Sequence, residues 1–195
     1  MRHIALARTV SILGHPLLML PLAVLALLAS SDGGGRNTLA IAAEFGVFAA
    51  VVMAYSWRQV RRGRWQHVDA SMRSERLALN RFLLVALACA ALFAWFGAMR
   101  ELALGMGLSA LLIAVAMLSS RYCKLSLHLA FAVYAAILLW RIDWRLGAGG
   151  LVFAALLAWS RLALQRHSPR DLVAGAAAGL FAGVALWQLL PMVLD

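Results

Sequence analysis

The sequence predicts an all-α integral membrane protein, a single polytopic bundle of six to seven transmembrane helices, and three observations support this fold class. Hydrophobic residues make up 64% of the 195 residues, whereas a soluble domain is usually about 45–50% apolar. The mean hydropathy is +0.85. Apolar runs recur along the chain, and most approach the roughly 20 residues that a helix needs to cross a bilayer. We therefore expect one integral membrane domain over residues 1–195 and no soluble domain.

The first apolar run, Val10–Ala29, follows Arg2 and Arg8 and contains the pair His15-Pro16. A cleaved signal peptide usually has an apolar core of about 7–15 residues, so this longer run predicts an uncleaved first span. A proline inside a helix kinks it. We expect such a kink here, with a histidine whose hydrogen bonds are satisfied locally rather than one that binds a ligand.

Six further apolar runs predict the remaining spans. They are Leu39–Trp57, Phe82–Ala98, Leu102–Ser119, Ser126–Trp140, Gly149–Leu164 and Leu172–Val193. Ser126–Trp140 is short and is expected to lengthen into its flanks, while a partly re-entrant Leu102–Ser119 would reduce the number of spans to six. The last span carries Gly175, Gly179 and Gly183, a spacing of four that favours close packing against another helix.

The net charge of +10 comes almost entirely from arginine, a residue suited to binding carboxylates and phosphates. The basic residues lie between the spans, which argues against nucleic acid and favours anionic lipid as a partner. Alternating spans place most of them at the end of the bundle that holds the N-terminus, and the positive-inside rule puts that end in the cytoplasm. The two cysteines, Cys89 and Cys123, are expected to be free thiols.

Three polar groups fall at this basic end, Asp69–Arg76, Lys124–His128 and Ser160–Asp171. They are separated by even numbers of spans and can therefore converge. In the third group, an arginine can hold phosphate oxygens bidentately. A neutral His167 can attack phosphorus, and a nearby carboxylate, Asp171, can fix its tautomer and stabilise the charge it gains.

Helix termini strengthen this interpretation. Ser168 and Pro169 predict a capped helix start, whose positive end favours an anion beside His167. Ser126 is expected to cap another helix in the same way, with His128 in its first turn. Each feature also has an ordinary explanation, such as a third-position capping acid, a membrane-flanking basic cluster or an interfacial histidine. The combination favours phosphate chemistry.

Together these groups resemble the type-2 phosphatidic acid phosphatase and vanadium haloperoxidase superfamily, in particular a divergent bacterial membrane branch. The motif S-R-x5-H-x3-D is complete, as Ser160, Arg161, His167 and Asp171. The motif P-S-G-H is partial, because Leu125–His128 keeps only its serine and histidine. In K-x6-R-P only Arg76 matches, since Asp69 replaces the lysine and Leu77 the proline. The resemblance covers residues 69–195 as a phosphatase-like core, and residues 1–57 add two spans without a family motif.

The resemblance implies a membrane lipid phosphatase that acts through a phosphohistidine intermediate, without a metal or other cofactor. The implied substrate is a lipid phosphomonoester or pyrophosphate of the polyprenyl pyrophosphate, phosphatidic acid or phosphatidylglycerophosphate class. The implied catalytic residues are His167 as nucleophile, Asp171 as its partner and His128 as general acid and base. The phosphate-binding residues would be Arg161, Ser126 and Arg76, to which we add Lys124 as the cation that Asp69 does not supply and Arg73 as a second candidate.

The expected location is the inner (cytoplasmic) membrane of a bacterium, and the expected partners are the bilayer and a lipid phosphate, with the oligomeric state left open. The resemblance implies a site on the outer face, whereas the charge count implies the inner face, and both orientations stay open. Two alternatives come from other classes: a non-catalytic lipid-binding or scaffold protein, and a haem protein with His128 and His167 as axial ligands, which a reduced-minus-oxidised spectrum tests. Peroxidase chemistry on vanadate is disfavoured, because the architecture of the soluble haloperoxidases is absent.

Overall fold

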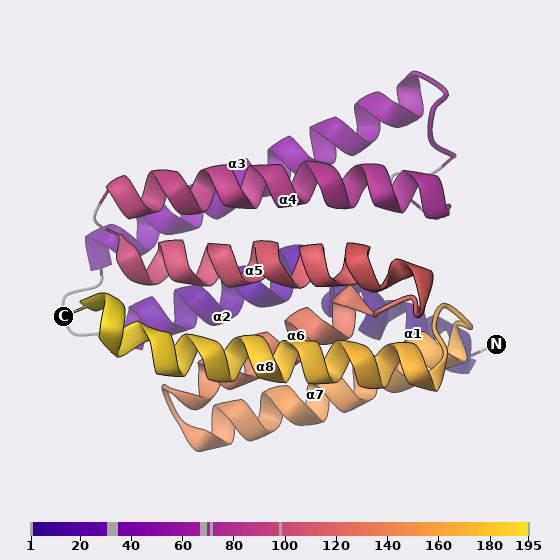
Figure 1. The fold of residues 1–195 in the computed structure, drawn as a ribbon. Coiled ribbons are helices and arrows are strands. Elements are labelled where there is room, and N and C mark those ends of the chain that lie inside the picture. The colour runs from indigo at the N-terminus through magenta and orange to yellow at the C-terminus, as the bar shows by residue number, and fades with distance from the viewer. Residues whose placement is uncertain (1, 31–34, 67–69, 71, 98, 195) are drawn as a thin grey trace.

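The structure is a computed structural model that describes residues 2–30, 35–66, 70, 72–97 and 99–194. Within these ranges all regular structure is helical. The elements are α1 (Arg2–Leu13), α2 (Pro16–Ser30), α3 (Gly35–Arg61), α4 (Arg73–Phe96), α5 (Arg100–Leu118), the 3-10 turn η1 (Ser119–Arg121), α6 (Leu127–Trp140), α7 (Trp144–Ala163) and α8 (Pro169–Leu194). The long helices run side by side, with the two chain termini at opposite ends of the bundle (Figure 1). The predicted polytopic helical membrane bundle is confirmed.

Five helices of the described chain, α3, α4, α5, α7 and α8, are each long and apolar enough to cross a membrane. α1 and α2 are long and apolar enough only as a pair, which is bent by 52° at its break and forms either a broken sixth span or a re-entrant loop. The predicted kink at His15-Pro16 is therefore confirmed, and the segment consists of two helices rather than one continuous helix. Pro16 is the first residue of α2, a position where proline's missing N–H leaves no helix bond unmade.

The short helix α6 lies at the centre of the bundle and does not lengthen into its flanks. Its 14 residues extend over about 21 Å, less than the roughly 30 Å of a bilayer core. It packs against α2, α5, α7 and α8, which explains why it is apolar all round. The re-entrant alternative for Leu102–Ser119 is wrong, because α5 is one continuous helix over this segment.

Close packing of α8 on α6 follows from the three glycines. A Cβ atom on Gly175 would lie 2.6 Å from the carbonyl oxygen of Ser126, and one on Gly179 would collide with the carbonyl oxygen of Ala130. A Cβ on Gly183 would come within 2.6 Å of the side chain of Ile137. The predicted role of this glycine repeat is confirmed, and the contact holds the start of α6 beside the start of α8.

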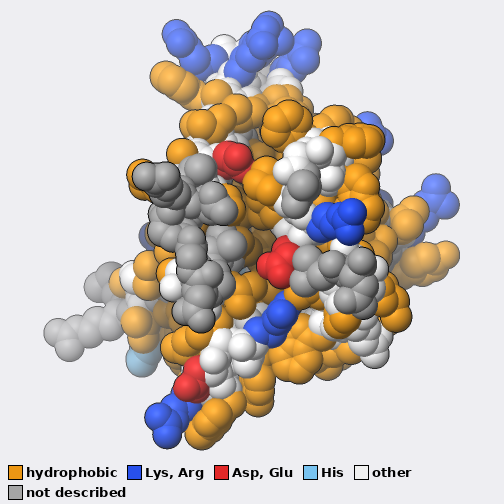
Figure 2. Space-filling view, turned by 90° about the vertical axis from the view of Figure 1, so that its left-hand side faces the viewer, with side chains coloured by type: hydrophobic (Ala, Val, Ile, Leu, Met, Phe, Trp, Pro, Cys, Tyr) orange, Lys and Arg blue, Asp and Glu red, His pale blue; other side chains and the backbone are white. Residues whose placement is uncertain are grey.

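The two ends of the bundle differ in character. Figure 2 looks onto the end that holds the C-terminus, where hydrophobic side chains cover most of the surface and charged side chains are scattered among them. The opposite end carries the end of α3, the start of α4, the α5–α6 connection and the α7–α8 connection (Figure 1). The three polar groups of the sequence belong to this second end.

Candidate active site

The start of α8 is built by a reciprocal pair of hydrogen bonds. Ser168 Oγ accepts from the backbone N–H of Asp171 at 3.3 Å, and Asp171 Oδ2 accepts from the backbone N–H of Ser168 at 2.9 Å. This is a capping box, with Pro169 as the first helical residue. The predicted capped helix start is confirmed, and it includes the capping role of Asp171.

Asp171 also ties the α5–α6 connection to α8. Its Oδ1 accepts from the backbone N–H of Lys124 at 2.9 Å. Its carbonyl oxygen accepts from the backbone N–H of Ser126 at 3.1 Å. The side chain is buried, with 8% of the residue exposed. One carboxylate thus joins the second and third polar groups of the sequence.

His167 lies between α7 and α8, outside the membrane-spanning helices. Its Nδ1 is 3.0 Å from the carbonyl oxygen of Lys124 and 3.8 Å from Asp171 Oδ2. A carbonyl oxygen only accepts hydrogen bonds, so Nδ1 carries the proton and the lone pair of the neutral ring is on Nε2. The backbone carbonyl therefore sets the tautomer, and Asp171 lies beside the same nitrogen as a nearby negative charge.

The pKa of His167 is lowered from its ordinary value of 6.5 to about 4, first by burial and then by the positive charges of Arg161 and Lys124. The hydrogen bond to the Lys124 carbonyl and the charge of Asp171 act in the opposite direction. The ring is therefore neutral near pH 7, which is the form that can act as a nucleophile.

Lys124 places a cation beside His167. Its Nζ donates to the carbonyl oxygen of Arg166 at 2.8 Å, a bond that uses one of the three donors of an ammonium group. Gln165 precedes this carbonyl with a φ of +53°, and this left-handed residue ends the turn that follows α7. Burial lowers the pKa of Lys124, and the neighbouring charges of Arg76 and Arg161 lower it further.

Of the two arginines predicted on α4, Arg76 is half-buried and interacts electrostatically with Lys124. Arg73 is exposed at the first residue of that helix. Asp69, the residue in place of the motif lysine, lies outside the described residues. The structure therefore brings Arg76 to the second and third polar groups and leaves Arg73 at the surface.

Arg161 and Ser160 are anchored by α1. Arg161 Nη1 donates to Ser11 Oγ at 2.8 Å, and Ser160 Oγ donates to the carbonyl oxygen of Ala7 at 2.6 Å. Ser160 is fully buried and Arg161 is 6% exposed. The arginine of the third motif is thus held in place by the N-terminal helix, and its positive charge reaches both Lys124 and His167.

Ser126 and His128 lie at the start of α6. Ser126 is the N-cap residue, but its side chain makes no capping bond, so the predicted side-chain cap is wrong. The hydroxyl is fully buried and has no hydrogen-bond partner among the described residues. His128, in the first turn, packs edge-to-face against His15 with ring centroids 5.2 Å apart, and it interacts electrostatically with Arg161 and His167.

Comparison with known families decides the identity of this region. Residues 118–194 match the family model of the PAP2 superfamily. These residues belong to the PAP2 superfamily. The searches of curated proteins and of solved structures gave no match. Members of the PAP2 superfamily are phosphatases, so the match indicates a phosphoric ester hydrolase in a membrane.

The PAP2 match contains His128, Arg161, His167 and Asp171 and begins after the two α4 arginines. Sequence reasoning missed Ser11 and the contact of His15 with His128, which come from the N-terminal span. It also missed the buried Glu75 in the first turn of α4, whose Oε1 and Oε2 accept from the backbone N–H groups of Gln66 and Met72 in the connection before that helix. In each case the sequence carries one signal for such a contact, a charged or polar residue in or beside an apolar run.

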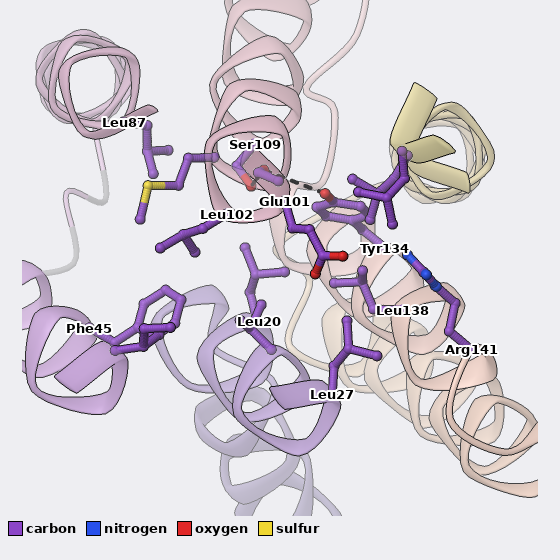
Figure 3. A pocket seen from close by; sticks show the side chains of 16 residues that line it. Leu20, Leu27, Phe45, Leu87, Glu101, Leu102, Ser109, Tyr134, Leu138 and Arg141 are labelled. Carbon is purple, nitrogen blue, oxygen red and sulfur yellow. Dashed lines mark hydrogen bonds between the residues drawn. The ribbon is translucent and has the colours of Figure 1, made fainter. Parts of the chain in front are cut away.

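The candidate site does not coincide with the described cavity. That cavity lies between α2, α3, α4, α5, α6 and α8 and encloses about 690 Å³, open space at its mouth included. Figure 3 shows its mainly aliphatic lining, with the hydroxyl of Tyr134 directed at Gly105. None of the predicted site residues lines it. Among the described residues, no three His, Cys, Asp or Glu side chains lie close enough together to hold a metal ion.

Proposed function

We propose that this chain is a membrane lipid phosphatase that hydrolyses a lipid phosphomonoester or pyrophosphate through a phosphohistidine on His167. The observation that carries the proposal is the contact of His167 Nδ1 with the Lys124 carbonyl oxygen. It leaves the lone pair on Nε2, the atom that would attack phosphorus. The lowered pKa of the ring keeps this lone pair available near neutral pH.

In the first step Nε2 of His167 attacks phosphorus, an N–P bond forms, and the bond from phosphorus to the leaving oxygen breaks. His128, cationic when the negative phosphate is bound beside it, gives its proton to that oxygen and becomes neutral. The phosphorylated imidazole of His167 becomes cationic, and the Asp171 carboxylate, 3.8 Å from His167 Nδ1, stabilises this new charge. Charge stabilisation of this kind is worth most in a buried site with fixed groups.

In the second step a water molecule attacks the phosphohistidine, His128 removes a proton from that water, and the N–P bond breaks. This releases inorganic phosphate and restores neutral His167. Arg76, Arg161 and Lys124 supply the positive charge that holds the phosphate oxygens, and the electrostatic effect of both arginines on Lys124 supports their convergence. The buried Ser126 hydroxyl, without a partner in the described chain, is the neutral donor at the same place.

The position of the candidate site supports a lipid substrate. The candidate residues lie where α4, α6, α7 and α8 begin or end, at one end of a bundle whose outer surface is hydrophobic. Large apolar side chains such as Phe96 and Val173 are 85% and 69% exposed. A substrate that stays in the bilayer would present its phosphate at this depth, whereas its hydrocarbon chain would remain among the lipids.

The test is phosphate release by detergent-purified protein from a panel of lipid phosphates in EDTA, with and without vanadate, beside His167→Ala. We expect vanadate-sensitive release that the variant lacks. A folded wild-type protein that releases no phosphate from any member of the panel would contradict the proposal. The same protein binding lipid phosphate vesicles without turnover would favour a non-catalytic lipid-binding protein.

A further inference from the structure

The N-terminal span lies outside the matched residues 118–194, yet it contacts three of the polar residues in that region. Ala7 accepts the hydrogen bond of Ser160, and Ser11 accepts that of Arg161. His15 packs against His128. Residues of α1 and of the break before α2 thus lie within the candidate site, and the third of these contacts joins two titratable rings.

His15 is held by the break between α1 and α2. Its Nδ1 accepts from the backbone N–H of Leu17 at 3.2 Å, which caps the first turn of α2. A ring nitrogen that accepts a hydrogen bond carries no proton, so His15 is neutral in this arrangement with its proton on Nε2. Gly14 keeps α1 close to α7, because a Cβ there would meet the side chain of Leu157 at 2.6 Å.

The capping role alone does not require histidine. Serine, asparagine and aspartate cap helix N-termini as well or better, and a polar ring within a membrane span is unfavourable without a compensating role. What histidine adds is its ring, which meets the ring of His128 at an interplanar angle of 86°. This geometry is a favourable edge-to-face aromatic arrangement, and it restricts the rotation of the His128 ring.

We infer that His15 is a positioning residue of the proposed phosphatase, whose ring fixes the orientation of His128 for proton transfer to the leaving oxygen. The inference rests on the proposed function and extends the site to a span without a family motif. A general acid must lie within hydrogen-bond reach of the oxygen that it protonates. A His128 ring that rotates away therefore lowers the rate of bond cleavage without changing how phosphate binds.

Two substitutions distinguish the contact of the His15 ring with His128 from the capping of α2 by His15. His15→Asn keeps an acceptor for the Leu17 N–H and removes the ring, whereas His15→Phe keeps a ring against His128 and removes the acceptor. His3→Asn is the matched control, because His3 is exposed on α1. Each variant is assayed beside wild type and His167→Ala with p-nitrophenyl phosphate, a good leaving group, and with phosphatidic acid, a poor one, and its melting temperature is measured.

We expect His15→Asn to lower kcat for phosphatidic acid about tenfold, in line with the loss caused by a small misplacement of a catalytic group. Its KM for phosphatidic acid and its kcat for p-nitrophenyl phosphate should stay within about twofold of the wild-type values. Its melting temperature should stay within a few degrees of that of wild type. His15→Phe should retain more of the phosphatidic acid activity and melt at a lower temperature. His3→Asn should match wild type throughout.

A kcat for phosphatidic acid equal to that of wild type in His15→Asn would overturn the inference, as would an equal loss of kcat with both substrates. In either case wild-type turnover that His167→Ala lacks would leave the proposed function standing. No release by folded wild type from these two substrates or from any lipid phosphate of the panel would instead overturn the proposed function, and the inference with it.

Discussion

The ring of His167 faces the protein through Nδ1, which lies 3.0 Å from the carbonyl oxygen of Lys124. This contact assigns the other ring nitrogen, Nε2, to the chemistry. We predict that acid-free quenching during turnover traps a phosphoryl group on the peptide that contains His167, attached at Nε2. Mass spectrometry locates the peptide and phosphorus NMR distinguishes the two nitrogens. Attachment at Nδ1, or on another residue, would contradict this geometry.

His128 is predicted to act as general acid and base. His128→Ala should lower kcat for phosphatidic acid by roughly 10²–10⁴-fold, the range found for positioned proton transfer, and should affect p-nitrophenyl phosphate much less. A series of substrates with leaving groups of increasing pKa measures the effect as a steeper dependence of rate on that pKa. Equal losses across the series would remove His128 from this role.

Asp171 is predicted to serve both stability and turnover. Asp171→Ala removes the acceptor for Ser168 and Lys124, and loss of a helix cap alone costs about 0.5–2 kcal/mol. Asp143 is the matched control, since it caps α7 by accepting from the backbone N–H of Arg145 at 2.6 Å. Both alanine variants should unfold more easily in detergent, but only Asp171→Ala should lose kcat. A kcat equal to wild type in Asp171→Ala would reduce Asp171 to a cap.

The sequence predicted the helical bundle, and it marked the turns at which the candidate residues meet, because both rest on strong local signals. Apolar runs of membrane length marked the spans, and the spacing from Arg161 to Asp171 marked the turn before α8. The break at His15-Pro16 was also predictable, since proline's effect on a helix is local. The contacts of Ser11 and His15 with the site were not, because they depend on how α1 packs on α7 and α2 on α6.

The Ser126 cap is a second case in which a tertiary contact could not be predicted from the local sequence. A serine before an apolar run predicts a side-chain cap from local preference, and Ser126 does occupy the N-cap position. Its hydroxyl instead makes no capping bond, while its backbone N–H is directed to the carbonyl of Asp171. The close approach of α8 through Gly175 sets this arrangement, and a tertiary contact of this kind leaves no pattern near Ser126 in the sequence.

The glycine contact between α6 and α8 predicts a stability difference between two glycine variants. Gly179→Ala forces a Cβ against the backbone carbonyl of Ala130, which cannot yield as a flexible side chain would, and should cost about 1–3 kcal/mol through overpacking. Gly149→Ala in α7 meets nothing within 4 Å and should stabilise its helix by about 0.5–1 kcal/mol. Melting temperatures in detergent measure both, and a Gly179→Ala variant as stable as wild type would contradict the packing.

The pKa of His167 predicts how stability depends on pH. The folded-state pKa is about 4, below the ordinary value of 6.5 that the unfolded chain would have. The unfolded state therefore binds a proton between these two values and the folded state does not. The contribution of His167 to stability is fully present above pH 6.5 and is lost as the pH falls from 6.5 to about 4.

The measurement is the melting temperature of wild type and His167→Asn at several pH values between 4 and 8. Asparagine does not titrate, so this variant keeps a polar side chain at the site without the proton linkage. We expect the wild-type melting temperature to fall relative to that of His167→Asn as the pH is lowered below 6.5, and the difference between them to stay constant above it. Parallel curves across the whole range would show that the pKa of His167 is not lowered by folding, and would remove the argument that its ring is neutral because of its burial beside Arg161 and Lys124.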